Sequence, residues 1–347
     1  MLSSPVSLKE VAAVAGCSPR VAAAVLNPGN SNIRVGASTQ QRILAVASEL
    51  GYRANGLAQA MATGKSRVLG ITVEGGPIEH RAWMLSGAIE AAAQRDYHVK
   101  VLSFRGLPTE VFQLCLDWRL AGLVSLSLRL EQNAYLIAQS KKFNTPLAIV
   151  DEIPADFDGI NVSSDEMQGI RQVLEHLFEL GHRDIGFLGA DEESTISQHR
   201  TSCFRVVSKE LGLRPHQSWI ASSDWSDRDI IAKAVSSLLE HPRPTAIVCA
   251  GDPLAMRVIA GARALGLHVP QDLSVTGFAN FFLSDMLDPP LTTIEQSFVE
   301  MGRVTIENMI SLLEDETQVD HPVRRRIKIP TRLIVRDSTA PPTERIA

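Results

Sequence analysis

Three consecutive residues near the N-terminus, Ser18, Pro19 and Arg20, carry groups that suit contact with a nucleic acid. A serine hydroxyl can bind a phosphate, a proline ring offers apolar contact, and a guanidinium can donate two hydrogen bonds to a guanine edge. The valine and alanines that follow have no hydrogen-bonding side chains. If this segment contacts DNA, Arg20 is the side chain that could read bases directly, and a phosphate clamp by the same side chain is the alternative.

A second set of polar residues follows apolar runs that resemble buried strands. Glu74 ends "GITVE", Asp151 ends "PLAIVD", and Asp252 opens a helix in "AGDPLAM". The first two carboxylates could bond the hydroxyls of a ligand or only cap loops. For Asp252 we expect capping of its helix, with a ligand contact as the alternative.

Signatures of catalysis and of metal binding are weak in this chain. "GKS" at positions 64–66 lacks the upstream glycine of a phosphate-binding loop, and neither GxSxG nor HExxH occurs. Cys17, Cys115, Cys203 and Cys249 lie far apart, which is unlike a metal or disulfide framework. We expect no enzyme activity, no cofactor and no metal.

Local signals predict that the N-terminal residues form three short helices. Ser7 and Glu10 make a capping-box pair, so a first helix can begin at Leu8, and Gly16 ends it. Ser18 can cap a second helix with a proline in its first turn, and breakers stop that helix at positions 27–29. A third apolar pattern ends at Gly51 and contains Ile43, Leu44, Val46, Ala47 and Leu50. This layout is that of a helix-turn-helix, whose second helix enters the major groove, and a plain three-helix bundle is the alternative.

The charge of the chain is unevenly distributed. The first 67 residues hold seven Lys and Arg against two Glu, a net charge of +5, so the other 280 residues carry −10 to give the overall −5. A basic segment on an acidic remainder suggests that only the N-terminal part meets a polyanion, and a solvated basic face is the alternative. No apolar run approaches the ~18 residues of a membrane span, and the N-terminus lacks a secretory signal. These features favour the cytoplasm.

After position 66, short apolar runs alternate with helical patterns. The strand candidates are "SRVLGITV", "HVKVLSF", "GLVSLSL", "PLAIVD", "RDIGFLGA", "TAIVCAG" and "DLSVTGF". Between them lie helix candidates such as 165–179 and 195–211. The alternation predicts parallel sheets covered by helices, repeated on either side of a break near 161–165. We therefore expect an α/β body of two doubly wound lobes, with ligands at the carboxyl ends of the strands.

Several long motifs resemble the lactose/galactose repressor family of bacterial transcription regulators. They are "VSLKEVAAVAGCSPRVAAAVLN", "RVGASTQQRILAVASELGYRANGLAQAM", "LFELGHRDIGFLGA", "LGLHVPQDLSVTGF", "DPPLTTIEQ" and "IPTRLIVRDSTAPP". They cover essentially the whole chain in the order of the family. The resemblance implies a periplasmic-binding-protein-like body, with three chain crossings between the lobes. It also implies a DNA contact set of Ser7, Ser18, Pro19, Arg20, Asn27, Arg34, Thr39, Tyr52, Asn55, Leu57, Ala58 and Met61.

Two parts of that set depart from the family pattern. The loop that contains Arg34 is longer than usual, and this arginine could reach a phosphate or only be solvated. Met61 stands where the family usually has leucine, in a hinge helix that orders on operator DNA and wedges an apolar side chain into the minor groove. A disordered tether is the alternative for this hinge.

The resemblance also implies an effector site between the lobes. Arg200 matches an effector-binding arginine and Trp225 an aromatic that stacks on the effector, whereas an exposed helical arginine and a core tryptophan are the alternatives. Gly251 and Ala279 replace an asparagine and an aspartate that commonly hold sugar hydroxyls. A sugar-like effector with fewer contacts, an acidic ligand on Arg200, or no effector all stay open.

Taken together, these patterns predict a homodimeric regulator, most simply a repressor, of near-palindromic operator DNA. A solute-binding protein and a sugar-processing enzyme are the alternatives. The dimer surface is expected in "HRAWMLSGAIE", with Trp83, Met84, Ala88 and Ile89. The expected parts are a head (1–54), a hinge (55–66), an N-lobe (67–162 with 294–320), a C-lobe (163–293 with 321–339) and a tail (340–347).

Overall fold

The computed structural model describes most of the chain, and it divides the protein into two compact units. The described residues are 6–26, 33–52, 66–75, 79–126, 130–150, 153, 157–190, 195–213, 215–225, 227–240, 242–315 and 324–343. Unit 1 comprises Met1–Val68 with Leu114–Ala121, and unit 2 comprises Leu69–Gln113 with Gly122–Ala347. We call residues 6–52 the head and the two α/β lobes the body.

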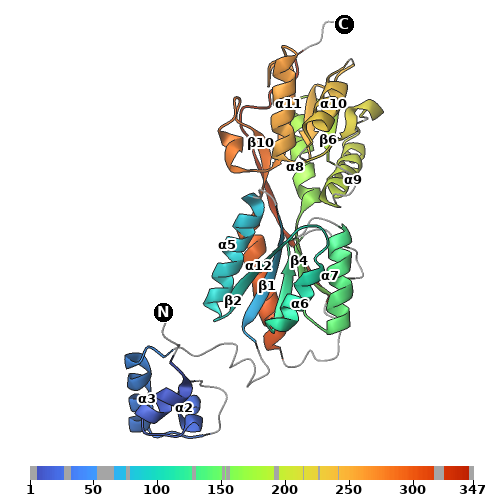
Figure 1. The fold of residues 1–347 in the computed structure, drawn as a ribbon. Helices are drawn as coiled ribbons and strands as arrows, with labels where there is room; N and C mark the ends of the chain where they lie inside the picture. The colour runs from blue at the N-terminus through green and yellow to red at the C-terminus, as the bar shows by residue number, and fades with distance from the viewer. Residues whose placement is uncertain are drawn as a thin grey trace. The chain divides into compact units, whose positions relative to one another are not determined.

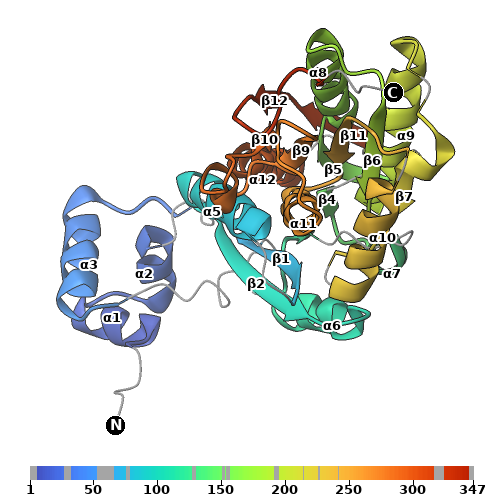
Figure 2. The same cartoon turned by 90° about the horizontal axis from the view of Figure 1, so that it is seen from above.

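The head is a bundle of three helices around a small apolar core. These are α1 (Leu8–Val14), α2 (Pro19–Leu26) and α3 (Ala37–Glu49), seen together in Figure 2. Local signals set their ends as expected: the Ser7–Glu10 capping box is formed, and Gly16 has a φ of +63°. One member of the expected apolar pattern differs, because Leu44 points to solvent and is 48% exposed. The core consists of Val11, Ala12, Ala15, Ala22, Val25, Ile43 and Ala47.

The first lobe is a six-stranded sheet with helices on both faces. Its strands follow the order β11-β5-β4-β3-β1-β2. Their bounds are β1 (Val68–Glu74), β2 (His98–Phe104), β3 (Gly122–Ser125), β4 (Leu147–Val150), β5 (Gly159–Ser164) and β11 (Arg324–Ile329). Helices α5 (Glu79–Gln94) and α12 (Phe298–Glu314) lie side by side on one face, and α6 (Thr109–Asp117) and α7 (Leu130–Phe143) cover the other (Figure 1).

Helices α5 and α12 pack so closely that both need a glycine at their contact. A Cβ on Gly302 would lie 1.9 Å from the carbonyl oxygen of Met84, and one on Gly87 would lie 2.0 Å from that of Val299. Met84 and Ala88 are buried at 4% and 3% exposure in this lobe. The expectation that these two residues form a surface for a second copy of the chain is therefore wrong.

The second lobe repeats the architecture. Its sheet has the order β12-β10-β9-β8-β6-β7, and within it β10 and β12 are antiparallel. The strands are β6 (Ile185–Gly189), β7 (Ile220–Ser222), β8 (Ala246–Cys249), β9 (Ser274–Ala279), β10 (Thr292–Gln296) and β12 (Thr331–Ile334). Helix α8 (Glu166–Glu179) packs on α9 (Thr195–Glu210), and α10 (Arg228–Leu239) packs on α11 (Asp252–Ala264). Short 3-10 turns are formed by η1 (Gln217–Trp219) and η2 (Phe282–Asp285).

The chain passes between the two sheets three times, which confirms the expected α/β architecture. The passages lie after β5, after β10 and between β11 and β12. The expected lobe boundaries are displaced from these points. Residues 294–296 belong to the second sheet and 324–329 to the first, because each strand stays with the sheet that satisfies its backbone hydrogen bonds.

Candidate functional site

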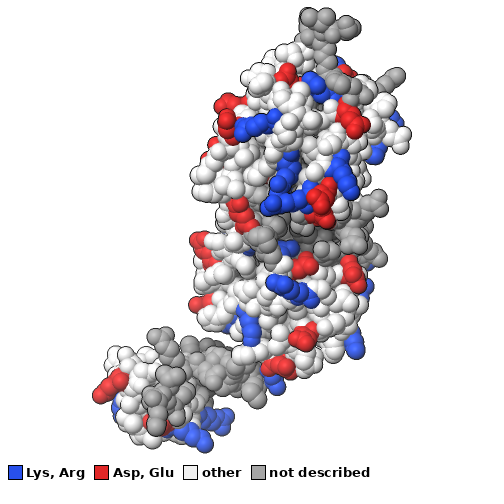
Figure 3. Space-filling model, turned by 45° about the horizontal axis from the view of Figure 1, so that its top comes forward, with Lys and Arg blue, Asp and Glu red and all other residues white. Residues whose placement is uncertain are grey.

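The exposed end of α2 is the candidate surface for reading DNA. Ser18 directly before α2 and Pro19 and Arg20 in its first turn are exposed. The Ser18 hydroxyl accepts a hydrogen bond from the Val21 amide at 3.3 Å. The alanines at positions 23 and 24 are partly covered. Arg20 is therefore the long polar side chain that the start of this helix presents to solvent. On the face drawn in Figure 3, Lys and Arg gather along one edge of the head.

Other expected DNA contacts in the head have different surroundings. The Ser7 hydroxyl donates to the Glu10 carboxylate at 2.8 Å and so serves the start of α1. Tyr52 packs against the core of the head, Thr39 is half-buried in the first turn of α3, and Arg34 is exposed. The expected contacts Asn27, Asn55, Leu57, Ala58 and Met61 lie outside the described residues.

In the body, Arg200 on α9 is buried and fully engaged by other protein groups. Its side chain is 4% exposed, and the side chain of its partner Glu166 is 2% exposed. Nε donates to one Glu166 oxygen at 2.5 Å and an Nη donates to the other at 3.1 Å. The guanidinium also donates to the Ala250 carbonyl and lies 3.8 Å from the centre of the Phe278 ring. An exposed helical arginine is therefore excluded, and the positive charge of Arg200 is met by Glu166.

The Arg200–Glu166 pair belongs to a polar network that joins both sheets. Gln296 at the end of β10 accepts from Arg200 at 3.1 Å and donates to Glu166 at 3.1 Å and to Ser164 at 2.8 Å. Ser164 ends β5 in the first sheet. The network thus lies at carboxyl ends of parallel strands, where open α/β sheets bind ligands.

Trp225 and Gly251 lie against each other at the end of β8. A Cβ on Gly251 would be 2.8 Å from the Trp225 ring, so the ring occupies space that a larger residue at position 251 would need. Trp225 is partly buried and packs on the core of the second lobe. The missing side chain at position 251 is thus explained by the approach of the indole.

The carboxylate of Asp252 does not cap its helix. Asp252 is fully buried and accepts hydrogen bonds from the Phe281 amide at 2.7 Å, the Ser284 hydroxyl at 2.7 Å and the Thr293 hydroxyl at 2.5 Å. The expectation of a cap is wrong, because these three donors from residues 281–284 and from β10 engage both oxygens. Asp252 fixes the loop after β9 and presents no free oxygen to a ligand.

Strained backbone and a cavity occur next to that loop. Ala279 is 4% exposed and has a φ of +125°, a conformation that side-chain-bearing residues rarely adopt and that often occurs at functional sites. It lines a cavity of about 430 Å³ that also contacts Trp83 and Asn280 and the residues 295–300. Of the expected effector residues, only Ala279 lines this cavity among the described parts of the chain.

On the first lobe, Glu74 holds a polar cluster at the end of β1. Its carbonyl accepts from Arg81 at 2.6 Å, and its carboxylate accepts from Gln132 at 3.0 Å. Asp151, the other expected carboxylate, lies outside the described residues. Glu74 is therefore engaged by protein donors, as a loop-fixing residue would be.

The contact between the lobes contains a histidine that sequence reasoning missed. His80 stacks on Phe281 at 5.9 Å between ring centres and lies 5.6 Å from Phe298. Its Nε2 is buried with no hydrogen-bond partner among the described residues. Burial, followed by the charges of Arg81 and Arg200, lowers the pKa of His80 to about 3. The residue is thus neutral in the folded protein at any physiological pH.

The low pKa of His80 predicts acid sensitivity. An unfolded chain binds a proton on this histidine near pH 6.5, whereas the folded chain resists until about pH 3. The contribution of His80 to stability should therefore be lost progressively as the pH falls from 6.5 towards 3. We expect His80→Phe, which keeps an aromatic ring, to reduce the drop in urea midpoint between pH 7.5 and pH 5. An unchanged drop would contradict the assignment, and His216→Phe in an exposed turn is the control.

Sequence reasoning also missed Glu166 and Gln296. The sequence holds no local signal for them, because the need for a carboxylate partner follows only from the burial of Arg200 that the structure shows. Among the described residues, no group of three or more His, Cys, Asp or Glu could hold a metal ion, and no helix is both long and apolar enough to span a bilayer.

Comparison with known proteins shows which proteins are similar to this chain. Residues 174–339 match the model of a periplasmic binding protein-like domain. The chain is 28% identical to the HTH-type transcriptional repressor CytR of Escherichia coli, with 96% of each chain covered. It is 28% identical to catabolite control protein A of Priestia megaterium, with 96% and 99% covered, and 25% identical to the HTH-type transcriptional repressor PurR of Photobacterium profundum, with 96% and 98% covered.

Solved structures of transcription regulators have a similar fold. A Lac repressor dimer bound to operator and the anti-inducer ONPF is similar with a TM-score of 0.83 and 24% identity, over 97% of this chain and 100% of that one. A complex of the transcriptional regulator CelR with cellobiose gives a TM-score of 0.70 and 22% identity, over 96% and 99%. The curated relatives are regulators rather than enzymes. Over 96% of its length this chain is therefore similar to bacterial HTH-type transcriptional repressors, and residues 174–339 match a periplasmic binding protein-like domain.

Proposed function

We propose that this protein is a DNA-binding transcriptional repressor whose operator affinity is set by a small molecule bound between its two lobes. The observation that carries the proposal is a helix-turn-helix head, with Arg20 exposed at the start of α2, in a chain that matches curated repressors over 96% of its length. The alternative of a solute-binding protein has no use for such a head.

In this proposal α2 lies in the major groove, where the first turn of a recognition helix contacts base edges. Arg20 reads bases, Ser18 and Arg34 bind phosphates, and Pro19 contributes apolar contact. The hinge, with Met61 as its wedge, is proposed to enter the minor groove. Specificity then depends on one long side chain in the head and on the shape of the operator at its centre.

The effector is proposed to be uncharged, with sugar-like hydroxyls as one option. Arg200 is neutralised by Glu166 at 2.5 Å, so an acidic ligand would have to displace a buried carboxylate. Asp252 has no free oxygen for ligand hydroxyls. We propose that the effector contacts the strand ends near Trp225, Gln296 and Ala279. Mass spectrometry of ligand retained on the purified protein would identify the molecule.

We propose a homodimer as the active unit, because one head covers only half of a palindromic site. Ile89 of the expected surface is 49% exposed. A second apolar patch, the η2 patch, consists of Phe282, Leu283 and Met286, which are 63%, 52% and 62% exposed. Contiguous apolar exposure of this kind marks a protein contact.

The function is tested by selecting bound sequences from random duplex DNA with the full-length protein. We expect an inverted repeat, bound by two chains and released or tightened when the identified effector is added. A lack of sequence preference, or a monomer bound at a single half-site with full affinity, would overturn the proposal.

The η2 patch yields a separate prediction. Phe282→Glu places a charge in the proposed dimer contact and should raise the dimer dissociation constant at least about tenfold, because one buried unpaired charge costs several kcal/mol. Sedimentation velocity measures the change. Val206→Glu, at a residue 45% exposed on α9, is the matched control and should leave the dimer intact. Equal effects of the two variants would exclude this patch as the interface.

A further inference from the structure

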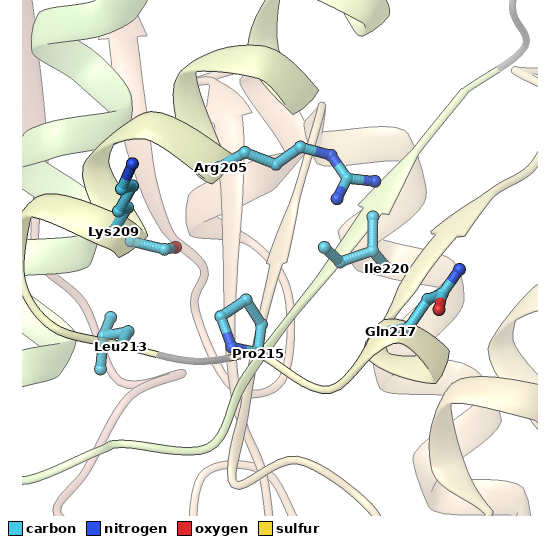
Figure 4. Close-up of a pocket in the computed structure, with 7 residues that line it drawn as sticks. Arg205, Lys209, Leu213, Pro215, Gln217 and Ile220 are labelled. Carbon is cyan, nitrogen blue, oxygen red and sulfur yellow. The ribbon is translucent and has the colours of Figure 1, made fainter.

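A second cavity lies in the C-lobe, away from the strand ends that form the effector site. It measures about 410 Å³ and lies between α9 and the edge strand β7 (Figure 4). Its lining residues are Arg205, Ser208, Lys209, Leu213, Pro215, Gln217 and Ile220. The volume is in the range of small-molecule sites.

The position of this cavity separates it from the effector site. Ile220 is the first residue of β7, so the cavity lies at the amino end of the parallel strands. Helix α9 runs from the carboxyl ends, where Arg200 meets Glu166, to the amino ends, where Arg205 and Lys209 line the cavity. A ligand here would therefore be a second ligand of the lobe, in addition to the effector.

Ser208 indicates that a polar partner belongs in the cavity. The residue is 2% exposed, and its hydroxyl has no hydrogen-bond partner among the described residues. Elsewhere on α9, the hydroxyls of Thr201 and Ser202 donate to carbonyls four residues earlier. A buried hydroxyl without a partner is costly, so a bound group is a physical reason for its position.

Two cations define the charge of that partner. Arg205 and Lys209 are exposed residues of α9 at the wall of the cavity. In Figure 4 the guanidinium of Arg205 extends from α9 towards Ile220 on β7. Glu210, the adjacent acid, is directed to the other side of the helix, where it binds Arg171 of α8 at 2.5 Å. The described lining contains no acidic residue.

The remaining lining sets the shape of the ligand. Leu213, Pro215 and Ile220 provide apolar contact, and the Gln217 amide can both donate and accept. We propose that this cavity binds a small molecule that carries a phosphate group on an apolar or planar body. The phosphate is held by Arg205, Lys209 and the Ser208 hydroxyl, and the body lies on the three apolar residues. Guanidinium and ammonium groups are the usual partners of phosphate.

The test uses calorimetry on the full-length protein with phenyl phosphate, inorganic phosphate and benzyl alcohol as probes. We expect saturable binding of one phenyl phosphate per chain, weaker binding of inorganic phosphate and none of benzyl alcohol at about 10 mM. Added salt should weaken binding, because the two cations are exposed. Absence of saturable phenyl phosphate binding would overturn the proposal.

Variants assign that binding to the cavity. Arg205→Gln with Lys209→Gln should raise the dissociation constant for phenyl phosphate at least about tenfold, as expected for loss of charged hydrogen bonds. Ser208→Ala should weaken binding without lowering the thermal midpoint, since it removes a hydroxyl that has no partner among the described residues. Lys233→Gln on α10 is the matched control and should bind like the wild type. Wild-type affinity in the double variant would place the phosphate elsewhere and refute the site.

Discussion

Replacing Arg200 by alanine is expected to lower the free energy of unfolding of the body by about 3–5 kcal/mol, because it leaves a buried carboxylate without its partner. The side chain of Glu166 is 2% exposed, and Gln296 alone would remain as its donor within this network. Urea unfolding followed by circular dichroism measures the change.

A surface pair on the same two helices provides the control. Arg171 on α8 binds Glu210 on α9 at 2.5 Å, with side chains 38% and 50% exposed. Arg171→Ala should cost less than about 1 kcal/mol, because water screens an exposed pair. If Arg200→Ala is as mild as Arg171→Ala, the buried pair is not what holds α8 to α9 at this point.

A double substitution distinguishes an unpaired charge from a general loss of packing. Glu166→Leu with Arg200→Met removes both charges and keeps similar volume, so most of the stability that Arg200→Ala removes should return. If the double variant is no more stable than the single one, the cost arises from packing on Phe278. Effector binding is therefore best probed in the double variant, since Arg200→Ala alone would combine an altered ligand site with a weakened fold.

Arg20→Ala is expected to weaken operator binding by about 1–3 kcal/mol for each base that Arg20 reads, twice over in a dimer, and to relax preference at one base pair of each half-site. The reason is that Arg20 is the long polar side chain exposed at the start of α2, beside partly covered alanines. A guanidinium that donates two hydrogen bonds to a guanine discriminates against the other bases by about this free energy.

The rival is that Arg20 only clamps a phosphate. All DNA sequences would then weaken alike, and the salt dependence of binding would fall by about one per subunit. Affinities for single-base operator variants at two salt concentrations distinguish the two roles. Arg42→Ala, at an exposed residue of α3, is the control and should leave base preference unchanged. If Arg20→Ala weakens binding to all operator variants equally, the base-reading role is refuted, and specificity must come from the hinge and from DNA shape.

The sequence by itself determined the head and most of the sheets. The capping box of Ser7 with Glu10, the turn at Gly16 and the proline that opens α2 act over three or four residues, so their outcome can be read without the fold. The runs that became β1, β6 and β8 were also evident, because strands buried on both faces are mostly apolar. Strands β5, β7, β10, β11 and β12 were not among the candidates. Strand β5 was missed because "GINVSS" contains polar side chains that this structure buries.

Only the tertiary structure decided what the candidate effector residues do. Glu166, the carboxylate partner of Arg200, lies 34 residues away in the chain, and Thr293, one of the three donors to Asp252, lies 41 residues away. Such pairs depend on which strand ends meet, and this follows from the order of the strands in the two sheets, with β11 in the first sheet and β10 and β12 in the second. Burial then determines which interactions these side chains make. A charged group removed from water must pair with an opposite charge or a hydrogen-bond donor that the fold places beside it.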